Sequence, residues 1–582
     1  MDVFQQIIDR LSYYVWEFGI PAGDGEIPLV AILLLGAGLY LTLRTGFAQI
    51  WHFAHGVAVT SGTYDNPDDP GDVSHFAALS TALSATIGTG NVAGVALAIH
   101  FGGPGALFWM WVTAVLGMAT KFSEVTLAQY YRQEEEGEAR KYGTVSGGPM
   151  YYIERGLGPG WVWLAVVFAL LLMTVSFFTG NAIQANTISD VMANDFSIPI
   201  WVSGIVSASL VAAVIIGGIK RIGKVTSILA PGMAALYVLG ALVILAGNAG
   251  QLLPTLGSVF TNAFDPQAGV AGTGTGAFLF TLTYGVQRGL FSNEAGMGSA
   301  PVAHSAAKTD EPVSEGVVAL LEPFIDTIVI CTLTALVILT TDAWTDREPT
   351  ELSIGGGSVT YVTNEGGPKF ITSGAPQAYP VEQGVPAVGE NAARFAWNDV
   401  PVDTFYTDPA QTELFTGTIR PQDGVAVTEE GEEINNLYGN AVESGAPLTQ
   451  LAFRKGLPGS WGNYIVLLCV SLFAVSTSIS WSYYGDRCAN YLFGASAIMP
   501  YRIFFILMHL VGAVAPLATI WAIGDVFLGL VIIPNLIAVL LLSGKLKEIT
   551  DSYFERKAWR SDPSVAGSDG PGGRVREGET VP

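Results

Sequence analysis

The chain has 582 residues, of which 50% are hydrophobic and only 13% are charged. A soluble protein of this length would carry about twice that charged fraction, so the composition predicts a polytopic membrane protein. The 50 acidic residues outnumber the 27 Lys and Arg residues, giving a formal net charge of −23, and this acidic excess excludes nucleic-acid binding. The acids lie mostly outside the apolar segments, which favours a halophilic source over an acidic loop in an ordinary organism.

Eleven apolar segments are long enough to span a membrane. In chain order they cover approximately residues 27–46, 75–100, 104–131, 161–192, 199–218, 225–247, 275–300, 312–340, 461–486, 499–522 and 524–544. Residues 1–26 lack the basic start and cleavage site of a signal peptide and are predicted to be an extracellular N-terminal segment.

Lys and Arg residues are concentrated in alternate loops. The loops 132–160 and 218–224 and the segment after 544 carry Lys and Arg residues, whereas the loops 193–199 and 248–274 contain none. Because basic loops stay on the cytoplasmic side, we predict an outside N-terminus and an inside C-terminus in the cell membrane.

A long polar stretch interrupts the apolar segments. Residues 341–460 are acidic and rich in Gly and Pro, and the alternation at 358–362 indicates short strands. We therefore expect an extracellular insertion between two parts of a transmembrane domain, 27–340 and 461–548. The cytoplasmic tail, 549–582, is predicted to be disordered.

Two apolar segments contain runs of Gly and polar residues that favour broken helices, at 84–94 and 289–301. Backbone groups freed by a break at membrane depth must face protein, water or a ligand. If the first apolar segment is set aside, the breaks fall in the first and sixth of ten spans. This placement predicts an all-α secondary transporter built from two inverted five-helix repeats, with one extra N-terminal helix.

The first break offers groups of opposite polarity. The half-helix that begins near Gly90 and Asn91 presents free N–H groups, which suit a carboxylate. The half-helix that ends near Thr86 presents free carbonyls, which suit Na⁺. Close packing of a glycine-rich helix is the alternative for a single break, but two breaks at matched positions favour a binding site.

Three polar or aromatic residues in the ninth apolar segment are candidates for the same site. The hydroxyls of Ser476 and Thr477 could join the carbonyls around Na⁺, or they could bond back to their own helix. Trp481 lies four residues after Thr477, on the same helix face, and could wall a small pocket or belong to an interfacial belt.

Other polar residues within the apolar segments have structural alternatives. Asn181 and Gln184, at i and i+3, share a helix face and mark either a site or interhelical hydrogen bonding. The spacings Lys121–Glu124, Arg288–Glu294 and Glu322–Asp326 allow contacts within helices. For these charges we favour structural pairing or gating, and a proton-relaying carboxylate is an alternative.

Several classes of protein are excluded by missing motifs. The cysteines Cys331, Cys469 and Cys488 show neither metal-ligand spacing nor a disulfide framework. No nucleotide-binding signature and no convincing catalytic set occurs, so we expect neither an ATP-driven pump nor an enzyme.

Five motifs carry a resemblance that extends over the membrane part of the chain. They are GTGNVAGVA at 88–96, GGPGALFWMW at 102–111, GGPMYYI at 147–153, SNEAGMGSAP at 292–301 and WSYYG at 481–485. These motifs closely resemble the alanine or glycine:cation symporter family. The insertion is longer than the family pattern, and the acidic surface is atypical of it.

The resemblance implies a leucine-transporter-like fold and Na⁺-coupled symport of alanine or glycine by alternating access. It implies that the substrate site comprises Thr86, Thr89, Gly90, Asn91, Gln184, Phe291 and Trp481. The implied Na⁺ site comprises the carbonyls of Ser84, Ile87 and Phe473 and the hydroxyls of Ser476 and Thr477. An H⁺-coupled symporter and an ion channel remain the alternatives. We expect a monomer in membrane lipid, with no organic cofactor and no nucleotide.

Overall fold

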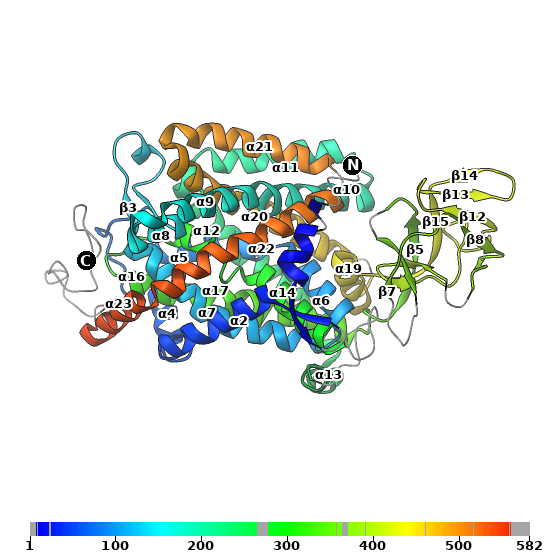
Figure 1. Cartoon of the computed structure of the whole chain (residues 1–582), viewed down its shortest axis with the longest axis horizontal. Helices are drawn as coiled ribbons and strands as arrows, with labels where there is room; N and C mark the ends of the chain where they lie inside the picture. Colours follow the sequence, from blue (N-terminus) through cyan, green and yellow to red (C-terminus); the bar gives the residue numbers. More distant parts are fainter. Residues whose placement is uncertain are drawn as a thin grey trace.

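The structure is a computed structural model that describes all residues except 1–6, 9, 23–24, 265–276, 357, 364–370, 390–391, 460, 516, 558 and 560–582. Its helices form an elongated bundle, and most of the strands project from one end of that bundle (Figure 1). The predicted disorder of the tail falls mostly outside the described residues, but its first part is wrong, because Ser543–Arg556 forms helix α23.

The helices that build the bundle follow in chain order. They are α2 (Leu29–Arg44), α3 (Ala48–Trp51), α4 (Phe53–Thr60), α5 (His75–Thr86), η2 (Gly90–Gly94), α6 (Val95–Gly102), α7 (Ala106–Tyr130), α8 (Pro149–Leu157), α9 (Val162–Phe177), η5 (Phe178–Ala182), α10 (Ile183–Phe196), α11 (Ile200–Ile215), α12 (Gly218–Gly247), α13 (Ala249–Asn262), α14 (Ala277–Asn293), α15 (Ala300–His304), α16 (Pro312–Ala319), α17 (Leu321–Pro323), η6 (Phe324–Cys331), α18 (Thr332–Thr340), α19 (Gly445–Gly456), α20 (Trp461–Phe493), α21 (Ile498–Val514) and α22 (Leu517–Leu541). Short hairpins pair β1 (Gly19–Ala22) with β2 (Gly25–Pro28) and β3 (Gln133–Glu134) with β4 (Val145–Ser146).

Each of the eleven predicted apolar segments contains helix. Among the described residues, seven helices are long and apolar enough to cross a membrane, or eight if the bent pair at the first break is one span. The helices α2 and α11 are apolar but shorter than the others. Many of the side chains on the outside of the bundle are large and hydrophobic, as a lipid-facing surface requires.

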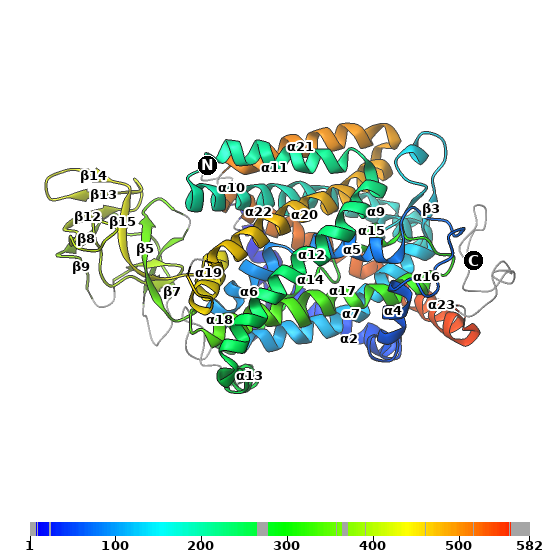
Figure 2. The same ribbon diagram turned by 180° about the vertical axis from the view of Figure 1, so that it is seen from behind.

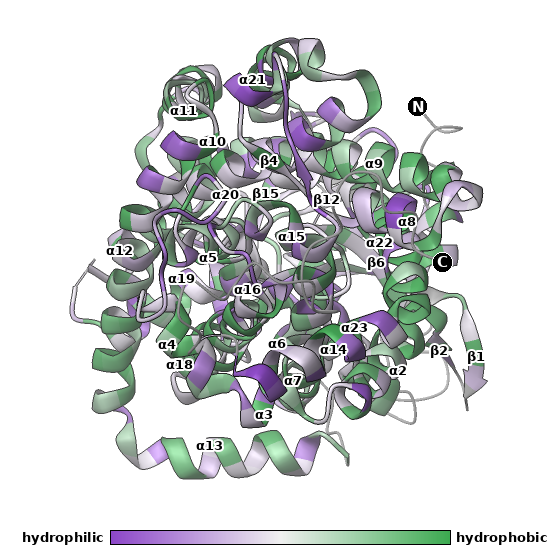
Figure 3. Cartoon of the chain, turned by 90° about the vertical axis from the view of Figure 1, so that its left-hand side faces the viewer, coloured by the Kyte–Doolittle hydropathy of each residue, from purple (hydrophilic) through white to green (hydrophobic). Residues whose placement is uncertain are grey.

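Two sequence-based boundaries differ from the structure. The last two spans meet at Ala515 and not near residue 523, because α21 ends at Val514 and α22 begins at Leu517. The predicted loop 248–274 contains α13, which lies across the bundle at its edge (Figure 3). This helix is too short to span a membrane, and it exposes Leu253 by 80%.

Both predicted breaks are present. At the first break α5 ends at Thr86, the helix resumes at Gly90, and the two axes differ by 53°. At the second break α14 ends at Asn293, and α15 begins only at Ala300. The intervening Gly296 and Gly298 have φ values of 95° and 75°, a left-handed backbone that favours glycine.

The insertion is a β structure with its own hydrophobic core. Strand β5 (Arg347–Ser353) pairs with β15 (Asn436–Val442) and closes its base. One sheet has the order β11 (Val400–Pro401), β10 (Arg394–Trp397), β6 (Val359–Thr363), β7 (Ile371–Thr372); the other has the order β14 (Glu433–Ile434), β13 (Val425–Thr428), β12 (Gly417–Arg420), β8 (Tyr379–Glu382), β9 (Val385–Pro386). The core includes Leu352, Tyr361, Tyr379, Phe395, Phe405 and Phe415.

The predicted limit of the insertion at 460 encloses a helix that packs against the bundle. Helix α19 lies beside α6, between the strands and the bundle (Figure 2). The Thr449 hydroxyl donates to the Val92 carbonyl at the first break, over 2.9 Å. The β structure therefore ends near residue 443, and α19 supports the broken helix.

We predict that the β structure can be removed at its base. Residues 354–435 would be replaced by Asn-Gly, which favours the tight turn needed to keep β5 and β15 paired. The shortened chain should stay monodisperse in detergent, with a thermal midpoint within about 5 °C of the full chain.

The control deletion, residues 350–450, cuts into α19 and should lower the midpoint further, because the Thr449 contact is lost. Equal midpoints for the two deletions would contradict the supporting role of α19.

Candidate functional site

A small pocket lies between the two breaks, and the space in it that atoms do not fill, open solvent included, is about 300 Å³. Its walls come from α5, η2, η5, α10, α14, α20 and α22. The lining residues are Ala85, Thr86, Gly88, Thr89, Gly90, Thr179, Gln184, Phe291, Glu294, Thr477, Trp481 and Leu528. Six of the seven predicted substrate residues are in this set. Asn91 is not in it.

Unpaired polar atoms point to a ligand in this pocket. Thr89 Oγ1, Thr179 Oγ1 and Gln184 Oε1 are buried without a hydrogen-bond partner among the described residues. A buried polar atom left unpaired costs about 1–3 kcal/mol, so a polar ligand that pairs with these atoms would be stabilised.

The helix irregularity at η5 explains why Thr179 was missed and which of the two alternatives holds for Asn181. The wider π turn at Phe178–Ala182 shifts the residues away from α-helical spacing, and Gln184 Nε2 donates to the Thr179 carbonyl over 3.1 Å. Asn181 instead donates to the Phe505 carbonyl and contacts His509 Nδ1, each at 2.7 Å. Asn181 and Gln184 therefore do not act together, and the interhelical alternative holds for Asn181.

Asn91 holds the first break in place and does not face the pocket. Its Oδ1 accepts from the Gly88 backbone N–H over 2.8 Å, and its Nδ2 donates to Asp326 Oδ1 over 2.6 Å. Ser292 Oγ, at the second break, also donates to Asp326, over 2.6 Å. These contacts join both breaks to η6.

The charged residues pair differently from the expected spacings. Lys121 Nζ lies 2.9 Å from Glu322 Oε1 on another helix, and Glu124 accepts from Asn535. The guanidinium of Arg288 lies 5.8 Å from the centre of the Phe291 ring. Glu294 lines the pocket and accepts from Ser299 Oγ over 2.5 Å.

A cluster of oxygens joins the end of α5 to α20. Thr477 Oγ1 lies 3.2 Å from the Ser84 carbonyl and 3.3 Å from the Ala85 carbonyl. Ser476 Oγ lies 3.3 Å from the Ser84 carbonyl and also bonds back to the Phe473 carbonyl, over 2.9 Å. Ser476 therefore meets a carbonyl of α5 and one of its own helix, and its Oγ also lies 3.3 Å from Met233 Sδ. Hard cations prefer oxygen ligands such as those gathered here.

The structure brings four of the five predicted ion-site residues together in this cluster. Ser84, Phe473, Ser476 and Thr477 are brought together, and Ala85 joins them although the sequence did not indicate it. Ile87, the fifth, is the C-terminal cap of α5, and its backbone N–H donates to the Leu83 carbonyl over 2.8 Å.

Trp481 packs against Gly180 of η5, which has no side chain to occupy that space. A Cβ added to Gly180 would lie 2.4 Å from Trp481 Cγ, so only glycine leaves room for the indole. The indole is 1% exposed and forms one wall of the pocket, with Phe291 on another element. The pocket width therefore depends on this packing.

A bent span and a second broken segment that line a polar pocket, beside a cluster of oxygens, are typical of secondary transporters. The family model described as "Sodium:alanine symporter family" matches residues 1–374 and 426–566, and the chain belongs to this family. Its relatives are transporters, so the chain is not an enzyme, and the family implies co-transport of Na⁺. The match leaves out residues 375–425, a stretch that contains strands β8 to β12 of the β structure, and the last residues, 567–582.

Individual relatives agree with this assignment. The sodium/alanine symporter AgcS of Methanococcus maripaludis is 37% identical over 556 residues, covering 95% of this chain and 98% of that protein. The putative sodium/proton-dependent alanine carrier protein YrbD of Bacillus subtilis is 30% identical over 540 residues, covering 92% and 91%. Among solved structures, MhsT in complex with L-phenylalanine is similar, with a TM-score of 0.45, 10% identity and coverage of 83% and 99%.

We predict that Thr477→Ala weakens the apparent affinity for Na⁺ about tenfold, because it removes one oxygen from the cluster. Thr477→Ser, which keeps the hydroxyl, should retain most of the affinity. Thr174→Ala is the control, since its hydroxyl bonds only within its own exposed helix turn. The measurement is the Na⁺ dependence of alanine uptake. An affinity within about twofold of wild type for Thr477→Ala would make this hydroxyl a packing group.

We also predict that Trp481 limits the size of the substrate. Trp481→Ala should admit leucine as a competitor and weaken alanine binding, whereas Gly180→Ala should push the indole into the pocket and weaken alanine binding without admitting leucine. Gly232→Ala is the matched control, because no atom lies within 4 Å of its added Cβ. Competition for radiolabelled alanine uptake measures both effects. Continued rejection of leucine by Trp481→Ala would place the indole outside the binding path.

Proposed function

We propose that the chain carries out Na⁺-coupled symport of alanine or glycine. The observation that carries this proposal is that Thr477 belongs to both the oxygen cluster and the pocket. Its hydroxyl belongs to the oxygen cluster between α5 and α20, and the same residue lines the pocket. A cation bound to the cluster would therefore order one wall of the substrate site.

The pocket suits a small zwitterion. The substrate carboxylate would dock on the free N–H groups where the helix resumes at Gly90, at the positive end of the helix dipole. The polar atoms of Thr89, Thr179 and Gln184 would pair with the substrate. Its side chain would lie between Phe291 and Trp481, which leaves room for hydrogen or a methyl group.

Coupling follows from alternating access. Na⁺ would join the end of α5 to α20 and order the pocket, the amino acid would bind, and the gates on the two sides would then exchange. We place the protein in the cell membrane as a monomer, with the β structure outside and α23 inside. Helix α23, which carries Lys545, Lys547 and Arg556, and the β structure lie at opposite ends of the bundle, which supports this orientation (Figure 1).

The acidic β structure contributes no residue to the pocket. We propose that it keeps a hydrated layer at high salt and is dispensable for transport. It touches the first broken helix at one polar contact, where His100 Nε2 lies 2.7 Å from the Asn398 carbonyl.

The test is uptake of radiolabelled alanine and glycine by proteoliposomes that contain the full chain. We expect uptake above the gradient-free level only with an inward Na⁺ gradient, because the oxygen cluster is the coupling site. Replacement of Na⁺ by choline should abolish accumulation. Unchanged accumulation in choline that follows an imposed pH gradient would favour the H⁺-coupled alternative, and a non-saturating flux would favour a channel.

A further inference from the structure

A second set of buried charges lies next to the second break and has no role in the oxygen cluster. Its members come from α5, α15, α16, α17 and α7, and each side chain is at most 5% exposed. They are His75, His304, Glu315, Glu322 and Lys121. Charged groups at membrane depth are costly and usually mark a pathway for ions or protons.

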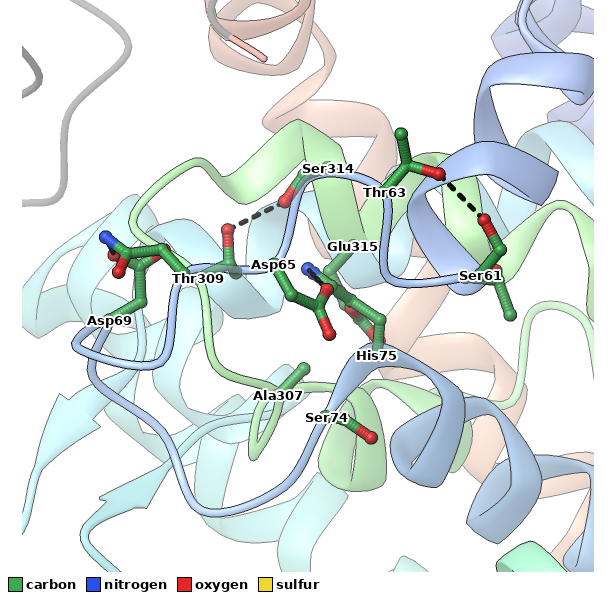
Figure 4. A network of polar contacts seen from close by, with 12 residues as sticks. Ser61, Thr63, Asp65, Asp69, Ser74, His75, Ala307, Thr309, Ser314 and Glu315 are labelled. Carbon is green, nitrogen blue, oxygen red and sulfur yellow. Dashed lines mark hydrogen bonds and ion pairs between the residues drawn. The ribbon is translucent and has the colours of Figure 1, made fainter. Parts of the chain in front are cut away.

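Hydrogen bonds join the middle of this chain of residues. Glu315 lies between two histidines, with Oε2 against His75 Nδ1 and Oε1 at 2.5 Å from His304 Nδ1. On the solvent side, the other ring nitrogen of His75 lies 3.9 Å from Asp65 Oδ1, which is beyond hydrogen-bond distance. Figure 4 shows Asp65 on the loop that precedes α5, directed toward His75. The Asp65 side chain is 40% exposed, so the chain of residues reaches solvent.

On the pocket side, a hydrogen bond is also missing between His304 and Glu322. His304 Nε2 lies 3.7 Å from Glu322 Oε2, and neither atom has a hydrogen-bond partner among the described residues. The other oxygen of Glu322 accepts from Lys121, over 2.9 Å. Glu294 lines the pocket and is hydrogen-bonded to Ser299, and the charges of Lys121 and Glu322 act on it through space. A proton would pass from Glu322 to Glu294 only through a bridging water or after a side chain moves.

The order of residue types is that of a proton relay. Carboxylates and imidazoles alternate from Asp65 to Glu322, and each can both accept and release a proton. Histidine changes its charge near neutral pH more readily than any other side chain. A structural ion pair would need only two of these groups. The unpaired atoms of His304 and Glu322, which face each other, add a link that a small movement would close.

We propose that the residues from Asp65 through His75, Glu315 and His304 to Glu322 form a proton path between the substrate pocket and the solution beside Asp65. The proposal rests on the proposed transport function, because Glu294 would exchange its proton with Glu322 as the pocket fills and empties.

Protons balance at each link. In the starting state both histidines are neutral, with protons on His304 Nδ1 and His75 Nε2, and Glu315 carries a proton on Oε2. When protonated Glu322 passes its proton to His304 Nε2, the Nδ1 proton of His304 moves to Glu315 Oε1, and the Oε2 proton of Glu315 moves to His75 Nδ1. His75 then releases its Nε2 proton to Asp65 or water, and rotation of the side chains restores the starting state. One proton enters at the pocket end and one leaves to solution, and the reverse sequence moves one proton from solution to the pocket.

Other charged or titratable groups face this path. They are Lys121 and Glu124 of α7, Asp326 of η6, Tyr484 of α20 and Glu294 of the second break. Three more charged or titratable groups lie on neighbouring segments. Arg132 donates to the carbonyls of Ser305 and Ala307. Arg556 pairs with Glu311, and His55 contacts Tyr553.

The experiment uses proteoliposomes of the full chain that contain a pH-sensitive dye, with the membrane potential clamped by K⁺ and valinomycin. Addition of alanine under a Na⁺ gradient should change the lumenal pH in wild type. Glu315→Gln should reduce this change at least about fivefold, because an amide cannot relay a proton. Glu311→Gln is the matched control, because Glu311 precedes α16 and pairs with Arg556 away from the path.

The outcomes separate this proposal from the Na⁺ proposal. Na⁺-dependent alanine uptake without a lumenal pH change in wild type would overturn the proton path and leave the symport intact. A full pH change in Glu315→Gln would also overturn it. If Glu315→Gln is not monodisperse by size-exclusion chromatography, His75→Gln tests the link between Glu315 and Asp65. A full lumenal pH change in His75→Gln would then overturn the path. Alanine-driven pH changes that persist in choline would support the path while contradicting Na⁺ coupling.

Discussion

The structure depends on how the backbone of two broken helices is satisfied inside a membrane. Asparagine side chains replace part of the missing helical bonds. Asn91 accepts from the Gly88 N–H at the first break, Asn293 accepts from the Ala295 N–H at the second, and Asn535 donates to the Gly296 carbonyl. These amides satisfy part of the backbone at the breaks, and backbone groups that they leave free must face protein, water or a ligand.

The same constraint explains the position of the ion and substrate sites. The carbonyls that α5 cannot bond internally meet the Ser476 and Thr477 hydroxyls, and Thr477 also lines the pocket. In the proposed function, binding at one site would therefore change the order of the other, which is the physical content of coupling. The bulk of Trp481, packed against Gly180, would then limit which side chains the ordered pocket accepts.

Polarity differs between the two ends of the bundle. At one end the β structure closes on the β5–β15 pair, and its nearest contribution to the transporter is the packing of α19 against the first break. At the other end the chain from Asp65 to Glu322 carries ionisable groups inward to the pocket. Solvent at the two ends therefore meets different chemistry, which a transporter with two gates requires.

The sequence by itself determined the features that are local in the chain. Both breaks followed from runs of glycine and polar residues within apolar segments, and the hydroxyl pair Ser476–Thr477 followed from its place in such a segment. The family motifs identified the class of transporter because they lie at these same local features. The alternation at 358–362 coincides with strand β6 for the same reason.

Only the tertiary structure decided which side chains meet across helices. Asn91 turns to Asp326, Lys121 pairs with Glu322 instead of Glu124, and the π turn at η5 sends Asn181 to His509 while Thr179 joins the pocket. Helical spacing specifies a face only for a regular helix, and the partner on that face comes from a segment distant in sequence. The relay from His75 to Glu322 was invisible in the sequence for this reason, since its members lie on four helices that only the folded bundle brings together.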